Sequence, residues 1–175
     1  MSETYKFKLI LFGNEFVGKT SIVNRYINDK YESEYVSTLG YNVYEKIVDI
    51  EGSNVNFLIF DIGGQEKFRD LRKKYANGAK AALLVYDITS QASFDNIVNW
   101  YNDLIEFTNN SYFILVGNKV DLEDIRQITK EEGEKLAKDL GALGFYETSA
   151  KNNIMIDEAF YIFAKNMINQ KKLQV

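Results

Sequence analysis

Residues 13–20 read GNEFVGKT and fit the pattern Gly-x4-Gly-Lys-Thr. The apolar run of residues 7–12 precedes them, and apolar side chains recur at helical spacing over residues 21–28. A short loop between a strand and a helix turns backbone N–H groups toward one point, where the positive end of the helix dipole also favours an anion. In such a loop Lys19 reaches the terminal phosphates of a nucleotide and the Thr20 hydroxyl ligates Mg2+. The stretch therefore predicts a phosphate-binding loop.

The composition excludes several kinds of chemistry. The chain of 175 residues is 46% apolar and 14% aromatic, which is enough for a single domain over residues 1–175 with a substantial core. It contains no cysteine and no histidine, so thiol nucleophiles, Ser-His-Asp triads, zinc fingers, haem ligation and disulfides are excluded. Carboxylates, hydroxyls, amides and lysines remain, together with a hard metal such as Mg2+.

Charge and hydropathy narrow the choice of partners. The net charge of -4 lacks the basic footprint of a sequence-independent nucleic-acid binder, so no nucleic acid is expected, and a small phosphorylated molecule or another protein is favoured. No apolar run is long enough for a transmembrane segment, and residues 1–6 lack the features of a secretory signal. We therefore expect a cytoplasmic protein, or one held at the membrane periphery by a means that this sequence does not show.

Predicted strands and helices alternate along the chain. Strands are expected over residues 7–12, 41–50, 55–61, 81–86, 112–116 and 145–147, with a tight turn at residues 51–54. Helices are expected over residues 21–28, 91–107 and 130–140, the last ending in a left-handed cap at Gly141. A C-terminal helix carries an apolar stripe that favours core packing over a membrane or partner surface: Ile156, Phe160, Phe163, Ala164 and Met167. Such alternation predicts a mostly parallel sheet with helices on both faces and a ligand beyond the carboxyl ends of its strands.

A second motif follows the predicted strand 55–61. Asp61 offers a carboxylate that can hold Mg2+ through water, Gly64 an N–H for a terminal phosphate, and Gln65 an amide that can orient a water molecule. Each residue type is common in turns, so the motif gains its meaning from its position after a strand of the same sheet.

Two further motifs indicate the base of the nucleotide. The stretch 118–121, Asn-Lys-Val-Asp, follows the strand 112–116, and its Asp121 can accept two hydrogen bonds from the N1–H and exocyclic amine of guanine. Adenine cannot match this arrangement because it has an acceptor at N1, which would leave a carboxylate unpaired. Ser149, Ala150 and Lys151 follow the last strand and can supply a backbone N–H to the guanine carbonyl. Together these motifs predict a guanine nucleotide.

In this order and spacing, the motifs resemble those of the Ras superfamily of small GTPases, over residues 6–171. The resemblance is greatest for the Rab branch, which is similar at residues 37–40, 67–71, 75–79, 83–89 and 115–122, whereas the pair Gly63 and Gly64 is similar to Arf proteins. It implies the α/β fold of a P-loop NTPase, a three-layer sandwich whose six-stranded, mostly parallel sheet is flanked by about five helices.

The resemblance also implies a function. Its members are molecular switches that bind GTP or GDP with Mg2+ and present two loops, switch I and switch II, to effector, exchange-factor and GTPase-activating proteins, as in membrane-trafficking-type regulation. No arginine lies near residues 35–38, so there is no evident internal arginine finger. Intrinsic hydrolysis should then be slow, on the order of 10⁻⁴ to 10⁻³ per second.

Individual residues acquire expected roles from the resemblance. Gln65 is expected to position the attacking water, and Mg2+ to be held by Thr20 and Thr38, with Asp61 behind a water molecule. Tyr31 matches the aromatic residue against the guanine, and Tyr35 the residue that closes over the terminal phosphate. The nucleotide contacts are expected at the positions that match the motifs of the family: Gly13, Glu15, Phe16, Val17, Gly18, Lys19, Thr20, Ser21, Tyr31, Tyr35, Thr38, Gly64, Asn118, Lys119, Asp121, Leu122, Ser149, Ala150 and Lys151.

Three departures from the pattern of the family qualify these roles. Glu15 stands where Ras has glycine and Rab proteins often have serine or glutamine, so its carboxylate either adds like charge near the terminal phosphate or points to solvent. Gly63 gives switch II additional backbone freedom. Because the chain has no cysteine, prenylation is not possible on it; either a tail was removed or membrane attachment is not part of the function.

Two functions remain open at this stage. The protein is either a GTP-hydrolysing switch or a GTP-binding scaffold with negligible hydrolysis because of Glu15. The presence of Gln65, Thr38 and Lys19 favours the switch. An ATP-using kinase or ATPase with the same loop is disfavoured by Asp121 and by the lack of a lid-like arginine cluster.

Overall fold

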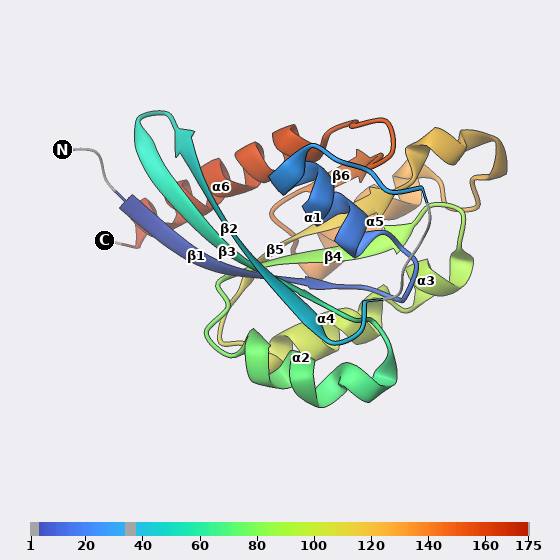
Figure 1. Cartoon of the computed structure of the whole chain (residues 1–175), viewed down its shortest axis with the longest axis horizontal. Coiled ribbons are helices and arrows are strands. Elements are labelled where there is room, and N and C mark those ends of the chain that lie inside the picture. Colours follow the sequence, from blue (N-terminus) through green and yellow to red (C-terminus); the bar gives the residue numbers. More distant parts are fainter. Residues whose placement is uncertain (1–3, 34–37, 175) are drawn as a thin grey trace.

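Strands and α-helices alternate in the computed structural model, which describes residues 4–33 and 38–174 (Figure 1). The strands are β1 (Thr4–Phe12), β2 (Tyr41–Ile50), β3 (Ser53–Ile62), β4 (Ala81–Asp87), β5 (Tyr112–Asn118) and β6 (Phe145–Thr148). The α-helices are α1 (Lys19–Asn28), α2 (Arg69–Ala76), α3 (Gln91–Asp95), α4 (Ile97–Phe107), α5 (Lys130–Leu140) and α6 (Ile156–Leu173). Two short 3₁₀ segments cover Glu66–Phe68 and Val120–Ile125.

The strands form a single six-stranded sheet in the order β2-β3-β1-β4-β5-β6. Only β2 and β3 pair antiparallel; the other neighbours pair parallel. The strand β1 lies between β3 and β4, and its Leu9 pairs with Ile59 on one side and Ala81 on the other. The strand order therefore reverses beside β1, and such a switch point is where open α/β sheets bind ligands. The expected α/β fold is confirmed.

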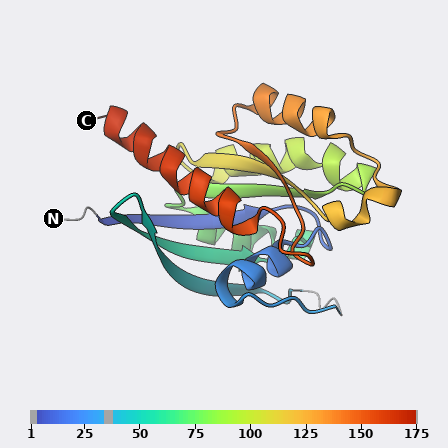
Figure 2. The ribbon, with the colours of Figure 1, turned by 90° about the horizontal axis from the view of Figure 1, so that it is seen from above.

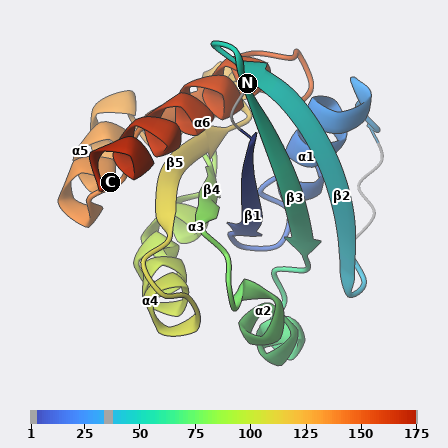
Figure 3. The same ribbon diagram turned by 90° about the vertical axis from the view of Figure 1, so that its left-hand side faces the viewer.

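Helices cover both faces of the sheet and bury two apolar clusters. On one face, α1 and α6 pack against side chains of β1, β3 and β4, whereas α2, α4 and α5 pack on the other face. Figure 3 shows this division, with α1 and α6 above the strands and α2 and α4 below. The rings of Tyr26 in α1 and Phe160 in α6 are stacked 3.8 Å apart. The stripe on α6 is fully buried, which confirms that it is a core surface.

The hairpin between β2 and β3 is tighter than expected. Its turn contains only Glu51 and Gly52, both with positive φ (52° and 82°). Such a pair of left-handed residues matches the right-handed twist of the two strands. Strand β3 consequently begins at Ser53, two residues earlier than predicted.

The predicted helix over residues 91–107 is in fact two helices. α3 ends at Asp95 and α4 begins at Ile97, and the side chain of the intervening Asn96 donates a hydrogen bond to the Asn14 side chain at 2.7 Å. Ile105 of α4 lies at a helical spacing from buried Ile97 and Leu104 that suggests the apolar face, yet it is 56% exposed. The helical spacing was correct locally, but it could not reveal the polar contact that fixes Asn96.

The two ends of the molecule carry different parts of the chain. The start of β1 and the end of α6 lie at one end, while the loops that carry the motifs lie at the opposite end (Figure 2). Among residues 4–33 and 38–174, no helix has both the length and the apolar character that a membrane span requires.

Candidate functional site

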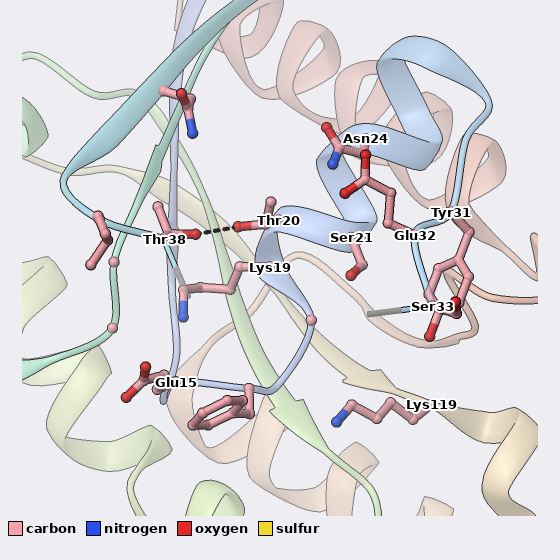
Figure 4. A pocket seen from close by; sticks show the side chains of 16 residues that line it. Glu15, Lys19, Thr20, Ser21, Asn24, Tyr31, Glu32, Ser33, Thr38 and Lys119 are labelled. Carbon is pink, nitrogen blue, oxygen red and sulfur yellow. Dashed lines mark hydrogen bonds between the residues drawn. The ribbon is translucent and has the colours of Figure 1, made fainter. Parts of the chain in front are cut away.

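The motif loops surround two adjoining cavities at the carboxyl edge of the sheet. The first, here called the loop cavity, has a volume of about 300 Å3 and is lined chiefly by Glu15, Phe16, Gly18, Lys19, Thr20, Ser21, Tyr31, Thr38, Gly64 and Lys119 (Figure 4). The second, the side cavity, has a volume of about 190 Å3 and is lined by Gly18, Ser21, Tyr31, Asn118, Lys119, Asp121, Leu122, Ala150 and Lys151. Four residues line both cavities, so together they form a continuous elongated site: Gly18, Ser21, Tyr31 and Lys119.

The loop between β1 and α1 wraps around the Lys19 side chain. Its Nζ donates hydrogen bonds to the carbonyls of Gly13 at 2.7 Å and Asn14 at 2.8 Å. Burial lowers the pKa of Lys19 to about 8, against the opposing effect of the Asp61 carboxylate. Gly18 adopts a left-handed conformation, and a Cβ there would lie 2.3 Å from the Asn118 Nδ2 atom. Only glycine therefore permits this close approach.

Three oxygen-bearing side chains meet beside Lys19. The Thr20 hydroxyl donates to Asp61 Oδ2 at 2.6 Å and lies 2.6 Å from the Thr38 hydroxyl. The Asp61 Oδ1 atom is buried and has no hydrogen-bond partner among the described residues. Burial also raises the pKa of Asp61, which the Thr20 hydrogen bond and Lys19 partly offset.

This oxygen set fits Mg2+. The ion usually takes one or two protein carboxylates and completes its shell with waters and substrate phosphates, so a single carboxylate with two hydroxyls is sufficient. The described residues contain no cluster of three or more acidic side chains that could form an all-protein metal cage. An unpaired buried carboxylate oxygen is costly, and a nearby cation or an ordered water would satisfy it.

The loop after β3 packs directly against the phosphate-binding loop. A Cβ on Gly64 would lie 2.5 Å from the Gly13 carbonyl oxygen and 2.8 Å from the Glu15 amide nitrogen. The Gln65 side chain reaches the same loop, where its Nε2 donates to Glu15 Oε1 at 2.7 Å. The sequence left Glu15 either near a phosphate or toward solvent; the structure places Glu15 in the lining of the loop cavity, with its carboxylate on the Gln65 amide.

The side cavity is built by supporting hydrogen bonds from β5 and β6. Asn118 is buried and donates to the Val17 carbonyl at 3.0 Å, while its own oxygen accepts from Thr148 at 3.0 Å. Ser149 is fully buried, and its hydroxyl donates to Asp121 Oδ1 at 2.6 Å. Asn118 thus joins the phosphate-binding loop to the end of β6.

Lys119 and the exposed wall of the side cavity complete the arrangement. Lys119 has a left-handed backbone, with φ of 71°, and its ammonium lies 2.7 Å from Asp87. Tyr31, Leu122 and Lys151 contribute partly exposed surfaces to the cavity wall. All the predicted contact residues thus gather around the two cavities or directly support them, except Tyr35, which lies outside the described residues.

Sequence reasoning missed two arginines that hold these loops. Arg25 of α1 donates to the carbonyls of Ala150 at 2.8 Å and Lys151 at 3.0 Å, so it fixes the loop after β6. Arg72 of α2 is buried beneath the loop after β3. Neither arginine belongs to a short motif. Arg25 donates to carbonyls of a loop far along the chain, and Arg72 donates to carbonyls of the loop that precedes its own helix. No pattern in the sequence signals such contacts.

A phosphate-binding loop at the switch point of a mostly parallel sheet defines the P-loop class of nucleotide-binding proteins. Comparison with known proteins agrees: the model of the Ras family matches residues 8–169. Rab-8A of Bos taurus is 42% identical over 170 residues, which cover 95% of this chain and 82% of the relative. Rab-8B of Homo sapiens is 39% identical over 173 residues, which cover 97% of this chain and 83% of the relative.

The chain therefore belongs to the Ras family, in its Rab branch. It is a GTPase and a GTP-binding molecular switch of the kind found in membrane trafficking.

Proposed function

We propose that residues 1–175 form one small GTPase domain that binds GTP and GDP with Mg2+ and slowly hydrolyses GTP to GDP and phosphate. The observation that carries this proposal is the continuous site formed by the two cavities, with Lys19 and two hydroxyls at one end and Asp121 at the other. Its position across a switch point of the sheet supports the same function.

The loop cavity takes the phosphates. Lys19 and the backbone N–H groups of residues 16–18 bind them, and the Gly64 N–H binds the third phosphate that distinguishes GTP from GDP. Support comes from the close packing of Gly64 on the phosphate-binding loop, which leaves no room for a side chain. Because only GTP offers the third phosphate, its presence orders the loop after β3 and its loss releases that loop.

Mg2+ is held by Thr20 and Thr38, with Asp61 behind a water molecule. When bound there, the ion would supply positive charge that offsets the negative charge of the phosphates during hydrolysis. The unpaired Asp61 Oδ1 and the short contacts of Thr20 support this assignment, since the side chains already converge. Ras-family GTPases generally use this ion.

The side cavity takes the guanine base. The Asp121 carboxylate accepts hydrogen bonds from its N1–H and amine, and Ser149 holds that carboxylate by a 2.6 Å hydrogen bond. Tyr31 lies along the base, and Ala150 and Lys151 present backbone N–H groups to the carbonyl of guanine. The hydrogen bonds from Arg25 to the carbonyls of Ala150 and Lys151 support this role, because they fix the loop before a base arrives.

Gln65 positions the attacking water, so the protein is a switch with slow intrinsic turnover rather than an inert scaffold. The sequence has no arginine near residues 35–38, which supports a need for an activating protein. That protein, together with exchange factors and effectors, would control the switch. We propose a cytoplasmic protein that acts peripherally at membranes, on the strength of its Rab relatives.

The test is a competition experiment with purified protein and a fluorescent GDP. We expect GTP and GDP to displace the probe in the presence of Mg2+, ATP to compete at least about a hundredfold more weakly, since discrimination rests on buried polar groups, and chelation of Mg2+ to speed GDP release. Equal competition by ATP would contradict the base assignment. Release that is insensitive to chelation would contradict the metal assignment.

A further inference from the structure

A buried cation lies beneath the loop that carries Gly64 and Gln65. Arg72 is only 1% exposed, and its guanidinium carbon lies 4.8 Å from the centroid of the Trp100 ring. Its Nη1 donates hydrogen bonds to the carbonyls of Gly63 at 2.9 Å and Gln65 at 2.7 Å. Both acceptors are main-chain groups, and they flank Gly64 on either side.

The hydrogen bond from Arg72 to the Gly63 carbonyl fixes the direction of the Gly64 N–H group. The described residues contain no cis peptide bond, and in a trans peptide unit the carbonyl of one residue and the N–H of the next point in opposite directions. Because Arg72 holds the Gly63 oxygen, the Gly64 N–H points away from α2. Gly64 itself packs against Gly13 and Glu15 of the phosphate-binding loop.

Packing alone does not account for an arginine at position 72. Burial of a guanidinium destabilises the folded state by roughly several kcal/mol, unless hydrogen bonds and opposite charges offset the loss of hydration. The Arg72 Nε atom has no partner among the described residues, and the nearest described carboxylate in an ion pair, that of Glu66, lies 3.9 Å away on a mostly exposed side chain. Methionine or leucine would fill the space against Trp100 without this cost. The charges of Asp103 and Glu66 and the Trp100 ring also favour a cation here, but among the described residues only the two loop carbonyls accept hydrogen bonds from the Arg72 guanidinium.

We propose that Arg72 is a positioning residue that aims the Gly64 N–H at the third phosphate and holds the backbone of Gln65 for hydrolysis. This inference rests on the proposed function, because it assigns Gly64 to the phosphate that only GTP carries. Arg72 then selects GTP over GDP without touching either nucleotide. It also links α2 to the nucleotide, since the same guanidinium is fixed to the helix and to the loop.

The experiment compares Arg72→Lys and Arg72→Met with Lys73→Gln as the matched control. Lys73 lies next in α2 but is 56% exposed at its side chain and pairs with Glu106 at 3.6 Å. For each protein we would measure the affinities for GDP and for GTPγS, a slowly hydrolysed analogue, with Mg2+, and the single-turnover rate of GTP hydrolysis. We expect both Arg72 variants to lose about tenfold in GTPγS affinity relative to GDP, equivalent to about 1.4 kcal/mol, and to hydrolyse GTP correspondingly more slowly.

Lys73→Gln should match the unmodified protein in all three measurements. A purely structural role for Arg72 predicts a different result, in which GDP and GTPγS affinities fall by the same factor or do not change, and either outcome would overturn the proposal. If both Arg72 variants fail to fold, the N–H resonances of the Arg72 guanidinium in the unmodified protein decide the question. They should shift between the GDP and GTPγS complexes, and unshifted resonances would overturn the proposal. Failure of the unmodified protein to bind either nucleotide would instead refute the proposed function.

Discussion

The carboxylate of Glu15 accepts a hydrogen bond from the side-chain amide of Gln65, with 2.7 Å between Oε1 and Nε2. The bond joins the phosphate-binding loop to the residue proposed to position the attacking water. A hydrogen bond to an ionised acceptor is roughly twice as strong as one between neutral groups. The Gln65 amide is therefore held by Glu15 of the phosphate-binding loop. In Ras the position of Glu15 is a glycine, which has no side chain to make this bond.

We predict that Glu15→Ala raises the single-turnover rate of GTP hydrolysis. The substitution removes the hydrogen bond from the Gln65 amide to Glu15, which competes with the water and the phosphate for that amide, and it removes like charge from the phosphate site. The expected gain is up to about tenfold, because each 1.36 kcal/mol of barrier corresponds to about a tenfold change in rate. Rapid quench of preloaded protein after addition of Mg2+ measures the rate.

The same substitution in a Gln65→Leu background separates the two causes. If the hydrogen bond limits hydrolysis, Glu15→Ala accelerates the reaction only when Gln65 is present, and the double-mutant cycle shows coupling. Equal acceleration in both backgrounds would mean that Glu15 acts through its charge alone. No acceleration in either would show that the 2.7 Å contact is irrelevant to the rate.

Asp121→Asn should shift the preference of the site from guanine toward xanthine. Asparagine offers an N–H donor where guanine also has a donor, whereas xanthine presents a carbonyl at that position. We expect GTP affinity to fall at least about a hundredfold, because a buried polar pair is left mismatched. Asp124→Asn is the control, since Asp124 is exposed in the same 3₁₀ segment. Unchanged GTP affinity in Asp121→Asn would refute the base assignment.

Trp100 should report the nucleotide state through its fluorescence. It is the only tryptophan in the chain, it lies under the Arg72 guanidinium, and its Nε1 donates to the Asn14 side chain at 2.7 Å. Its ring thus contacts both the phosphate-binding loop and the helix that carries Arg72. We predict a change in emission when GTPγS replaces GDP, and no further change when excess GTPγS is added. Identical spectra in the two complexes would show that neither neighbour moves.

Phe16 carries backbone strain that a glycine would relieve. It has a φ of 69°, a left-handed conformation that bulky residues rarely adopt, while its side chain is 56% exposed. We predict that Phe16→Gly is more stable than Phe16→Ala by about 1 kcal/mol, because both remove the ring but only glycine lacks a Cβ. Denaturant unfolding of the GDP complexes measures the difference. Equal stability of the two variants would exclude strain at this residue.

The sequence predicted the order of the elements and most of the site because the signals are local. The phosphate-binding loop, Asp61 and Asp121 each follow a short apolar strand, and parallel strands bring their carboxyl ends to one edge. Side chains that act through contacts far along the chain escaped prediction. Asn14 is a variable position of its motif, yet its oxygen accepts hydrogen bonds from both Asn96 and Trp100.

Helix α2 and its buried arginine were also missed, for a related reason. The helix spans Arg69–Ala76 and is short and largely charged, so the helical spacing of its apolar Leu71 and Tyr75 is too brief to set it apart in the sequence. Arg72 looks like any surface arginine until the loop after β3 and Trp100 enclose it. Similarly, the sequence did not signal the hydrogen bond from the Ser149 hydroxyl to Asp121 Oδ1. Burial decides these roles, and burial depends on the whole fold.

The most direct test of the account is single-turnover GTP hydrolysis by the purified protein with Mg2+, beside Gln65→Leu. We predict a slow rate for the unmodified protein, on the order of 10⁻⁴ to 10⁻³ per second. In Gln65→Leu the rate should fall at least about tenfold while the affinity for GTP is retained, because the amide acts on the water rather than on binding. Equal rates in the two proteins, or no hydrolysis by the unmodified one, would contradict the central claim.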